Sequence, residues 1–375
     1  MAFFSKKESF IGLDIGTSSI KIVELVRNGK EGISLSTYAS AKSSLSLAQS
    51  DNGDSVAKVA TIAHEMLRRS GASATSTVVA LPSLSVFSAV ISLPEMNERD
   101  LEKAVVLAAK NYVPTPLKDV VLGWTVMKES AAGLKNTTTV ESENEKDKSA
   151  ENKARRQLAH GNFEIFLTAA SKDLVQNYSS VVEHLNLNLV ALETESFPLS
   201  RSLLGSLKEP ALLVDIGDLA TNFSIVDNGY LRINQGSDIG GDTITKAIVA
   251  KLGISEDEAE KRKCKLGLIQ DVSNDSLASA AKTVVKDIVE RSTNLRRIFE
   301  RKSNRSVAKT ILIGGGANLN GLAEYWSEVS GIPAEVGNPW KGIKVPHVLT
   351  NKLLTIGPSF AVAVGLALRE FELSE

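Results

Sequence analysis

Hydrophobic and polar positions along the chain form short apolar blocks, which predict strands, and longer stretches with apolar residues at helical spacing. Two of the strand blocks share one layout. In residues 10–29, and again in residues 211–229, an apolar run ends in an aspartate, a glycine makes a tight turn, and a second strand stops at Asn-Gly. The two aspartates are Asp14 and Asp215. Hairpins built alike predict two similar half-domains that face one another.

The rest of the chain has the element pattern of an α/β protein. Strands are predicted at 77–81, 84–93, 120–127, 163–170, 188–193 and 309–313, and helices at 55–69, 97–111, 172–185, 195–204, 243–252, 255–265, 277–302 and 322–330. Asn97 is a candidate helix cap, with Asp100 at the third helical position. Residues 128–162 lose the apolar periodicity and are rich in Glu, Lys, Asn, Ser and Thr, so we expect a disordered surface loop rather than a docking motif.

These elements predict three segments. Residues 1–83 form a first lobe with the first hairpin, and residues 84–193 form a small inserted α/β module that contains the loop. Residues 194–375 form a second lobe with the second hairpin, and its C-terminal helix is expected to return to the first lobe.

The turns of the two hairpins have the chemistry of a phosphate site. Small residues let backbone N–H groups approach a phosphate, and the hydroxyl groups add hydrogen-bond donors. The first turn offers Gly16, Thr17, Ser18, Ser19 and the charge of Lys21, and the second offers Gly217, Asp218 and Thr221. Asp14 and Asp215 could hold hydrated magnesium between them, because magnesium keeps several of its waters. One such turn is an ordinary hairpin turn, whereas two copies favour a phosphate-binding pair.

A glycine-rich segment follows the predicted strand at 309–313. Gly314, Gly315 and Gly316 lead toward the helix at 322–330, so they place backbone amides near a helix N-terminus. Alone, three glycines are equally typical of a bare loop. In a chain with two phosphate hairpins they favour a contact with a nucleoside.

Composition narrows the class of protein. The chain has 375 residues, of which 43% are hydrophobic and 23% charged, with a net charge of −1 and a pI of about 6.5. No bulk positive field is available for nucleic acid. Cys264 is the only cysteine, which excludes an intrachain disulfide, and we assign it no role. No uninterrupted apolar run has the length of a membrane span or of a signal peptide, so we expect a cytoplasmic protein.

The ordered set of both hairpins, residues 240–242 and residues 314–316 resembles the actin, heat-shock chaperone and sugar kinase superfamily. A finer resemblance is to the PilM family of type IV pilus assembly proteins, carried by residues 11–21, 93–96, 109–116, 338–340 and 365–369. The resemblance implies an actin-like two-lobed ATPase fold of duplicated ribonuclease H-like domains, with a small α/β module inserted in the first lobe.

The resemblance also implies a site for ATP and Mg²⁺. Asp14 and Asp215 would hold the metal through waters, and the two turns would meet the β- and γ-phosphates. Gly240, Gly241 and Asp242 would lie near the ribose, and the 314–316 glycines with Asn318 would shape the adenine side. Glu260 and Lys263 resemble the superfamily's pair for ribose and adenine, and a solvated charged helix is the alternative.

Hydrolysis needs a side chain that orients the attacking water. In the superfamily this residue comes from the helix before the second hairpin, so the candidates are Glu193 and Glu195. We expect tight ATP binding with slow turnover or none, and ATP acting as a clamp between the lobes.

In PilM-like proteins the inserted module borders a groove for the cytoplasmic tail of a membrane-anchored PilN partner. The resemblance therefore implies a cytoplasmic protein held at the inner membrane through that partner, with pilus motor ATPases and self-association as further contacts. Two other classes stay open. One is an FtsA-like cell-division scaffold, which normally needs a C-terminal amphipathic membrane helix. The other is a small-molecule kinase, although no motif supplies its substrate carboxylate.

Overall fold

The computed structural model describes residues 8–27, 29, 32–45, 47, 53–127, 162–269 and 275–372. The chain divides into two compact units. The larger is formed by residues 1–86 and 171–375, and the smaller by residues 87–170.

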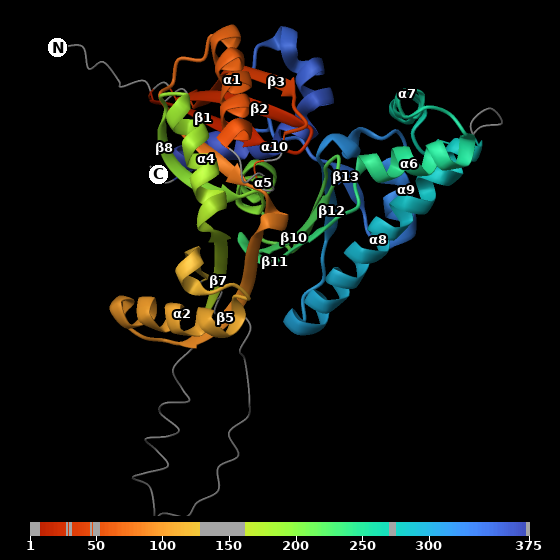
Figure 1. Ribbon diagram of the computed structural model, residues 1–375. Helices are drawn as coiled ribbons and strands as arrows, with labels where there is room; N and C mark the ends of the chain where they lie inside the picture. Colours follow the sequence, from red (N-terminus) through yellow and green to blue (C-terminus); the bar gives the residue numbers. More distant parts are fainter. Residues whose placement is uncertain are drawn as a thin grey trace, which may run out of the picture. The chain divides into compact units, whose positions relative to one another are not determined.

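The larger unit begins with a five-stranded sheet (Figure 1). Its strands are β1 (Glu8–Ile15), β2 (Ser19–Arg27), β3 (Ile33–Lys42), β4 (Ser76–Leu81) and β8 (Asn188–Thr194). The strand order is β3-β2-β1-β4-β8, with β1, β2 and β3 antiparallel and with β4 and β8 parallel to β1.

A second sheet in the same unit repeats this topology. Its strands are β9 (Ala211–Ile216), β10 (Thr221–Asp227), β11 (Tyr230–Ser237), β12 (Lys309–Ile313) and β13 (Ala334–Val336). The order is β11-β10-β9-β12-β13, again with three antiparallel strands followed by two parallel ones. Both sheets also contain a register shift between their second and third strands. This duplication confirms the predicted pair of similar half-domains.

Helices cover these sheets. They are α1 (Gly53–Ser70), α4 (Lys172–His184), α5 (Ser196–Leu204), α6 (Gly241–Leu252), α7 (Glu256–Leu266), α8 (Asp275–Ser303), α9 (Leu322–Ser330) and α10 (Thr350–Glu372). The second sheet packs with α6, α8 and α9 around a core that includes Phe223, Ile288 and Trp326.

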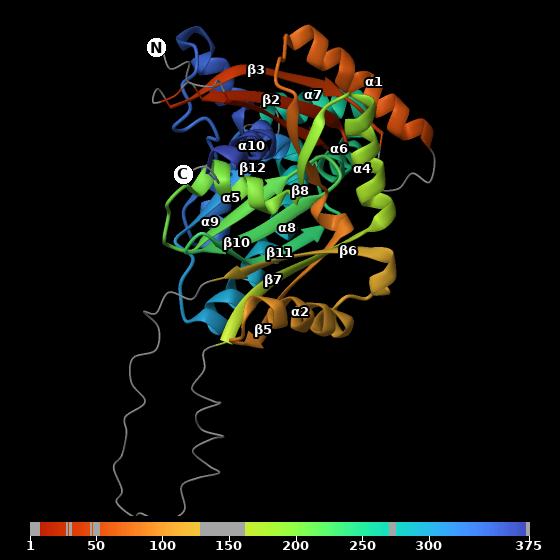
Figure 2. The same cartoon turned by 90° about the vertical axis from the view of Figure 1, so that its left-hand side faces the viewer.

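The C-terminal helix α10 packs against the first sheet, and Figure 2 shows it nearly end-on beside β2. Val23, Leu25, Phe360 and Val364 belong to the shared core. Residues 347–372 are long and apolar enough to cross a membrane, but most of that stretch is buried inside the protein. Helix α10 approaches β1 closely at Gly12, because glycine has no β-carbon. A β-carbon there would lie only 1.9 Å from the Ala363 carbonyl oxygen.

Among its described residues, the smaller unit has a three-stranded sheet, one α-helix and the short helix η3 (Leu117–Asp119). Strands β5 (Val86–Pro94), β7 (Asn162–Ser171) and β6 (Val120–Met127) pair in that order, and α2 (Glu98–Tyr112) packs on them. Asn97 caps α2 as predicted, since its side chain accepts the Asp100 N–H. The hydrophobic core of the smaller unit includes Val105 and Ile165.

This unit is narrower than the predicted module at 84–193. The cause is pairing beyond the local sequence: β8 joins the first sheet beside β4, and α4 packs against α1. Both elements therefore belong to the larger unit. The predicted loop at 128–162 lies outside the described residues, except for Asn162, which begins β7.

Candidate functional site

A cavity of about 630 Å³ in the larger unit collects most of the predicted nucleotide residues. Those that line it are Asp14, Gly16, Thr17, Ser18, Ser19, Lys21, Asp215, Gly217, Asp218, Gly241, Glu260, Lys263, Gly314, Gly315, Gly316 and Asn318. Its volume is in the usual range of small-molecule sites. The chain therefore brings both hairpins and the glycine-rich segment to one place.

The turns of the two hairpins have the same geometry. The Gly16 N–H donates to the Ser19 carbonyl at 3.0 Å, and the Gly217 N–H donates to the Ala220 carbonyl at 2.8 Å. A β-carbon on either glycine would lie within 3.1 Å of the carbonyl that its own N–H contacts. Glycine thus keeps both turns tight and leaves the backbone open to the cavity.

Three of the predicted residues do not line the cavity: Thr221, Gly240 and Asp242. Thr221 is fully buried and donates its hydroxyl to the Ile239 carbonyl at 2.6 Å. A β-carbon on Gly240 would lie 2.4 Å from the Asp218 carbonyl, and the Asp242 N–H donates to that same oxygen at 2.9 Å. These residues support the second turn from behind.

Carboxylates dominate one end of the cavity. Asp14, Asp215 and Glu195 all line it, and Lys21 Nζ lies 3.1 Å from Asp14 Oδ2. Burial, followed by the charge of Asp14, raises the pKa of Asp215 to about 6, although Lys21 opposes the shift. Burial, followed by the charge of Asp215, raises the pKa of Glu195 to about 8. The site therefore has an excess of carboxyl groups over cations.

Glu195 is held at the start of α5. Its Oε2 accepts hydrogen bonds from the Ser83 N–H and from Asn222 Nδ2, both at 2.9 Å. Ser83 follows β4 of the first sheet and Asn222 lies on β10 of the second, so this carboxyl bridges the two halves. Tyr178 on α4 also lines the cavity, and burial, with the charges of Glu195 and Asp14, raises its pKa.

Glu193, the other candidate for orienting water, does not line the cavity. Its carboxylate pairs with Arg201 at 3.0 Å and with Arg369 at 2.8 Å. The prediction that Glu193 orients the attacking water is therefore corrected. Glu193 lies near the end of β8, and its two arginine partners link β8 to α5 and α10. Only Glu195 of the two candidates faces the site.

The cavity wall formed by α6 and α7 is built around Lys263. This side chain is buried, and its Nζ contacts the Gly241 carbonyl at 2.9 Å, Thr245 Oγ1 at 2.9 Å and Glu260 Oε2 at 2.6 Å. The alternative of a solvated charged helix therefore does not hold for Lys263. Cys264, which we assigned no role, also lines the cavity and is exposed.

The glycine-rich segment packs against β9, the first strand of the second hairpin. Gly314 has a φ of 80°, and its N–H donates to the Pro358 carbonyl at 2.9 Å. A β-carbon there would lie 2.4 Å from Asp215 Oδ1. The short helix η4 (Gly315–Asn318) follows at once. Any other residue at position 314 would be strained and would push on the Asp215 carboxylate.

Sequence reasoning missed several parts of the lining, and two of them interact with Glu195. The first is η2 (Ser83–Ser85) with Pro82, and the second is Tyr178. The place of η2 could have been predicted. It follows β4, which runs parallel to β1, and the carboxyl ends of parallel neighbouring strands meet at one sheet edge. Nothing local marked Tyr178.

The donor set suits a hydrated cation better than a directly coordinated metal. Within the described part of the chain, no group of three or more His, Cys, Asp or Glu side chains is placed to hold a metal ion. Asp14, which is buried, and Asp215, which is partly buried, lie near one lysine and leave negative charge that a water-bearing Mg²⁺ would neutralise. The residues present therefore fit magnesium held through waters.

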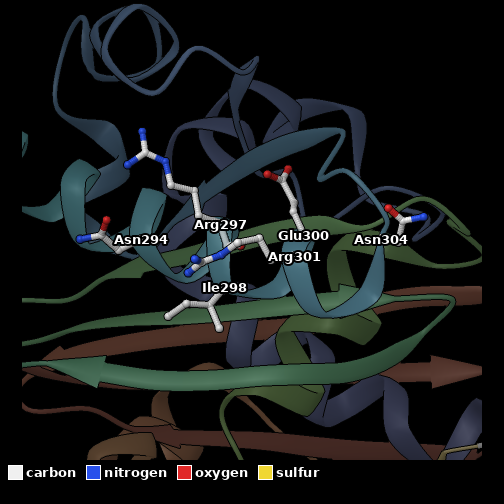
Figure 3. Close-up of a pocket in the computed structure, with 6 residues that line it drawn as sticks. All are labelled: Asn294, Arg297, Ile298, Glu300, Arg301 and Asn304. Atoms are coloured by element: carbon white, nitrogen blue, oxygen red, sulfur yellow. The ribbon is translucent and has the colours of Figure 1, made fainter.

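A second depression, of about 780 Å³, lies on the outer face of α8 (Figure 3). Five of its lining residues come from that helix, namely Asn294, Arg297, Ile298, Glu300 and Arg301, and Asn304 follows the end of the helix directly. Their side chains spread apart rather than converge on a point (Figure 3). We assign it no chemistry.

Two sheets of equal topology, with paired hairpin turns at one cavity, define the actin-like fold. Solved structures agree. A PilM–PilN type IV pilus biogenesis complex matches with a TM-score of 0.77 and 24% identity over 96% of this chain and 97% of that one. EutJ from Carboxydothermus hydrogenoformans matches with a TM-score of 0.54 and 17% identity over 96% and 89%. MreB5 of Spiroplasma citri bound to AMPPNP matches with a TM-score of 0.50 and 12% identity over 98% and 97%.

The particular family follows from the sequence itself. A family model described as type IV pilus assembly protein PilM matches residues 12–154 and 153–371. The chain therefore belongs to the PilM family of type IV pilus assembly proteins. This confirms the resemblance and favours the pilus class over the FtsA-like scaffold and the small-molecule kinase.

Proposed function

We propose that this pilus assembly protein binds ATP with Mg²⁺ in the cavity and, in one nucleotide state or more, binds the cytoplasmic tail of a PilN-like inner-membrane protein. The observation that carries the nucleotide part is the convergence of both glycine turns, Lys21, Asp14 and Asp215 on one cavity. The match to MreB5 bound to AMPPNP supports the same assignment.

Each wall of the cavity has a separate task in this proposal. Backbone N–H groups and hydroxyls of residues 16–19 bind the terminal phosphates, and Lys21 adds a point charge. Asp14 and Asp215 orient the waters of the metal, and bound Mg²⁺ supplies neutralisation of phosphate charge. Lys263 and Glu260 face the nucleoside, while the glycines at 314–316 let the backbone approach the base.

Slow turnover follows from the state of Glu195. Before nucleotide and metal bind, a pKa of about 8 keeps a proton on its carboxyl at neutral pH, and in that state it does not accept one from water. Its Oε2 also accepts hydrogen bonds from the Ser83 N–H and from Asn222 Nδ2. The residue therefore holds the two halves together more readily than it activates water, and nucleotide acts as a ligand that favours one state.

The partner rests on family membership and on the matched complex, which contains PilN. A cytoplasmic protein bound to such a tail would be peripheral to the inner membrane. Contacts with pilus motor ATPases and between copies of this chain remain predictions.

The single cysteine provides the test of nucleotide binding. Burial, followed by the hydrogen bond to Glu260, raises the pKa of the Cys264 thiol, so labelling with DTNB is best followed at alkaline pH. ATP with Mg²⁺ should slow the labelling. Asp14→Ala and Asp215→Ala should weaken this protection by about tenfold or more, whereas Asp54→Ala, on the exposed side of α1, should not.

Equal protection in all four proteins would refute the pocket assignment. The partner is tested by pull-down with the cytoplasmic N-terminal segment of the PilN-like protein, with and without ATP. No capture in either state would refute the partner.

A further inference from the structure

The smaller unit is inserted into the larger one at two junctions, and both lead directly to the cavity. At the first, η2 is followed immediately by β5, whose residues from Phe87 onward belong to the smaller unit. At the second, β7 ends at Ser171, which caps α4 by accepting the Leu174 N–H at 3.2 Å. Two turns further along α4, Tyr178 lines the cavity.

The first junction is held by polar contacts inside the cavity. Pro82, Ser83, Leu84 and Ser85 all line it. The Ser83 N–H donates to Glu195, the same carboxyl that accepts from Asn222 of the second sheet. A ligand that changes the position or charge of this carboxyl therefore acts on the backbone of η2.

An apolar contact ties the same junction to the second sheet. Leu84 is 53% exposed, yet η2 packs against β11. A β-carbon on Gly236 would lie 2.2 Å from Leu84 Cδ2 and 2.7 Å from Leu84 Cγ. The leucine therefore sits directly on the glycine, and any other residue at position 236 would displace it.

We infer that η2 transmits nucleotide binding to the inserted unit, with Leu84 on Gly236 as the contact that couples them. This inference rests on the proposed function. Nucleotide in the cavity changes how the two sheets approach each other around Glu195, and Leu84 carries that change from β11 into η2. Because η2 continues as β5, the inserted unit responds as a body. The coupling gives a protein that hydrolyses slowly a way to report its nucleotide state to whatever the inserted unit binds.

The test follows hydrogen exchange of the full chain across β5, at residues 86–94, with and without saturating ATP and Mg²⁺. In the wild type, nucleotide should change this exchange by about fivefold or more, which is the lower range of measured coupling between sites. Gly236→Ala should displace Leu84 and reduce the response to less than about twofold. Cys264 labelling on the same samples reports occupancy of the cavity.

Two further variants keep the result interpretable. Leu84→Ala removes the contact from the other side, and at saturating nucleotide it should also lose the response, even if Gly236→Ala folds poorly. Leu354→Ala is the matched control, because Leu354 is 51% exposed and does not line the cavity. It should respond as the wild type does.

Three outcomes would overturn the inference. Protection of Cys264 without any change at β5 in the wild type would show that nucleotide binds but is not transmitted. A full response in both Gly236→Ala and Leu84→Ala would show that this contact is not the route. Absence of Cys264 protection in the wild type would refute the proposed function itself, and the inference with it.

Discussion

Glu195→Gln separates the charge of the central carboxyl from its shape. The amide keeps an oxygen that can accept from Ser83 and Asn222, as Glu195 Oε2 does at 2.9 Å from each. The substitution removes only ionisation. In the folded protein, burial and then the charge of Asp215 raise the pKa of Glu195 to about 8, from an ordinary value of 4.5.

The sign of the effect follows from proton binding. Between pH 4.5 and about 8 the unfolded chain has lost the Glu195 proton while the folded protein keeps it, so this group's contribution to stability falls as pH rises. The full gap corresponds to roughly 5 kcal/mol. The Glu195 side chain borders a cavity that admits water, so we expect the free energy of unfolding to fall by only about 2 kcal/mol of this full value.

The assay is urea unfolding followed by circular dichroism, without nucleotide, at pH 5 and pH 9. Glu195→Gln should match the wild type within about 1 kcal/mol at pH 5 and exceed it by about 2 kcal/mol at pH 9. Glu209→Gln, at an exposed position, serves as the control. The reasoning is refuted if the difference between Glu195→Gln and the wild type is the same at both pH values.

Three further substitutions test single contacts. Gly314→Ala forces a β-carbon into a backbone with a φ of 80° and against Asp215, so it should lower stability by about 1–3 kcal/mol in thermal unfolding and abolish protection of Cys264 by ATP. Glu193→Gln weakens a partly buried ion cluster and should cost about 2 kcal/mol; thermal unfolding measures this, while an unchanged nucleotide affinity would agree with a structural role and a changed one would contradict it. Trp340→Phe removes the indole donor to the Leu353 carbonyl at 2.8 Å and should cost about 1–2 kcal/mol in urea unfolding, with no loss being the contrary result.

Local signals in the sequence were sufficient for most elements of this fold. Asn97 before α2 is a boundary that the sequence alone predicts, and the structure has it. Strand β3 was missed because its apolar alternation is weak. It gains stability from pairing with β2 on one side and from the Ser34–Lys344 bridge on the other. Those partners are distant in sequence.

The same distinction applies to the site. Most residues found by sequence lie in or beside turns whose glycines and hydroxyls mark them locally, whereas Glu260 and Lys263 lie on α7. Thr221 belongs to such a segment, but its side chain is buried, as is that of Ile20 at the equivalent place in β2. The alternation of side chains along a strand decides which of them are buried, and the residue types in the motif do not reveal it. Ser83 and Tyr178 reach the cavity only through tertiary packing, so single-sequence reasoning had little to act on.

The two hairpins are equal in geometry and unequal in charge. Asp14 pairs across its hairpin with Lys21, and Asp215 pairs in the same register with Asn222. The first carboxylate therefore has its own cation, while the amide at the matching place turns to Glu195 and leaves Asp215 without one. Burial and then the charge of Asp14 raise the pKa of Asp215, and Lys21, which pairs with Asp14, opposes the rise only in part. The matched hairpin positions therefore supply two carboxylates and one cation to the cavity, and this charge balance favours an added cation.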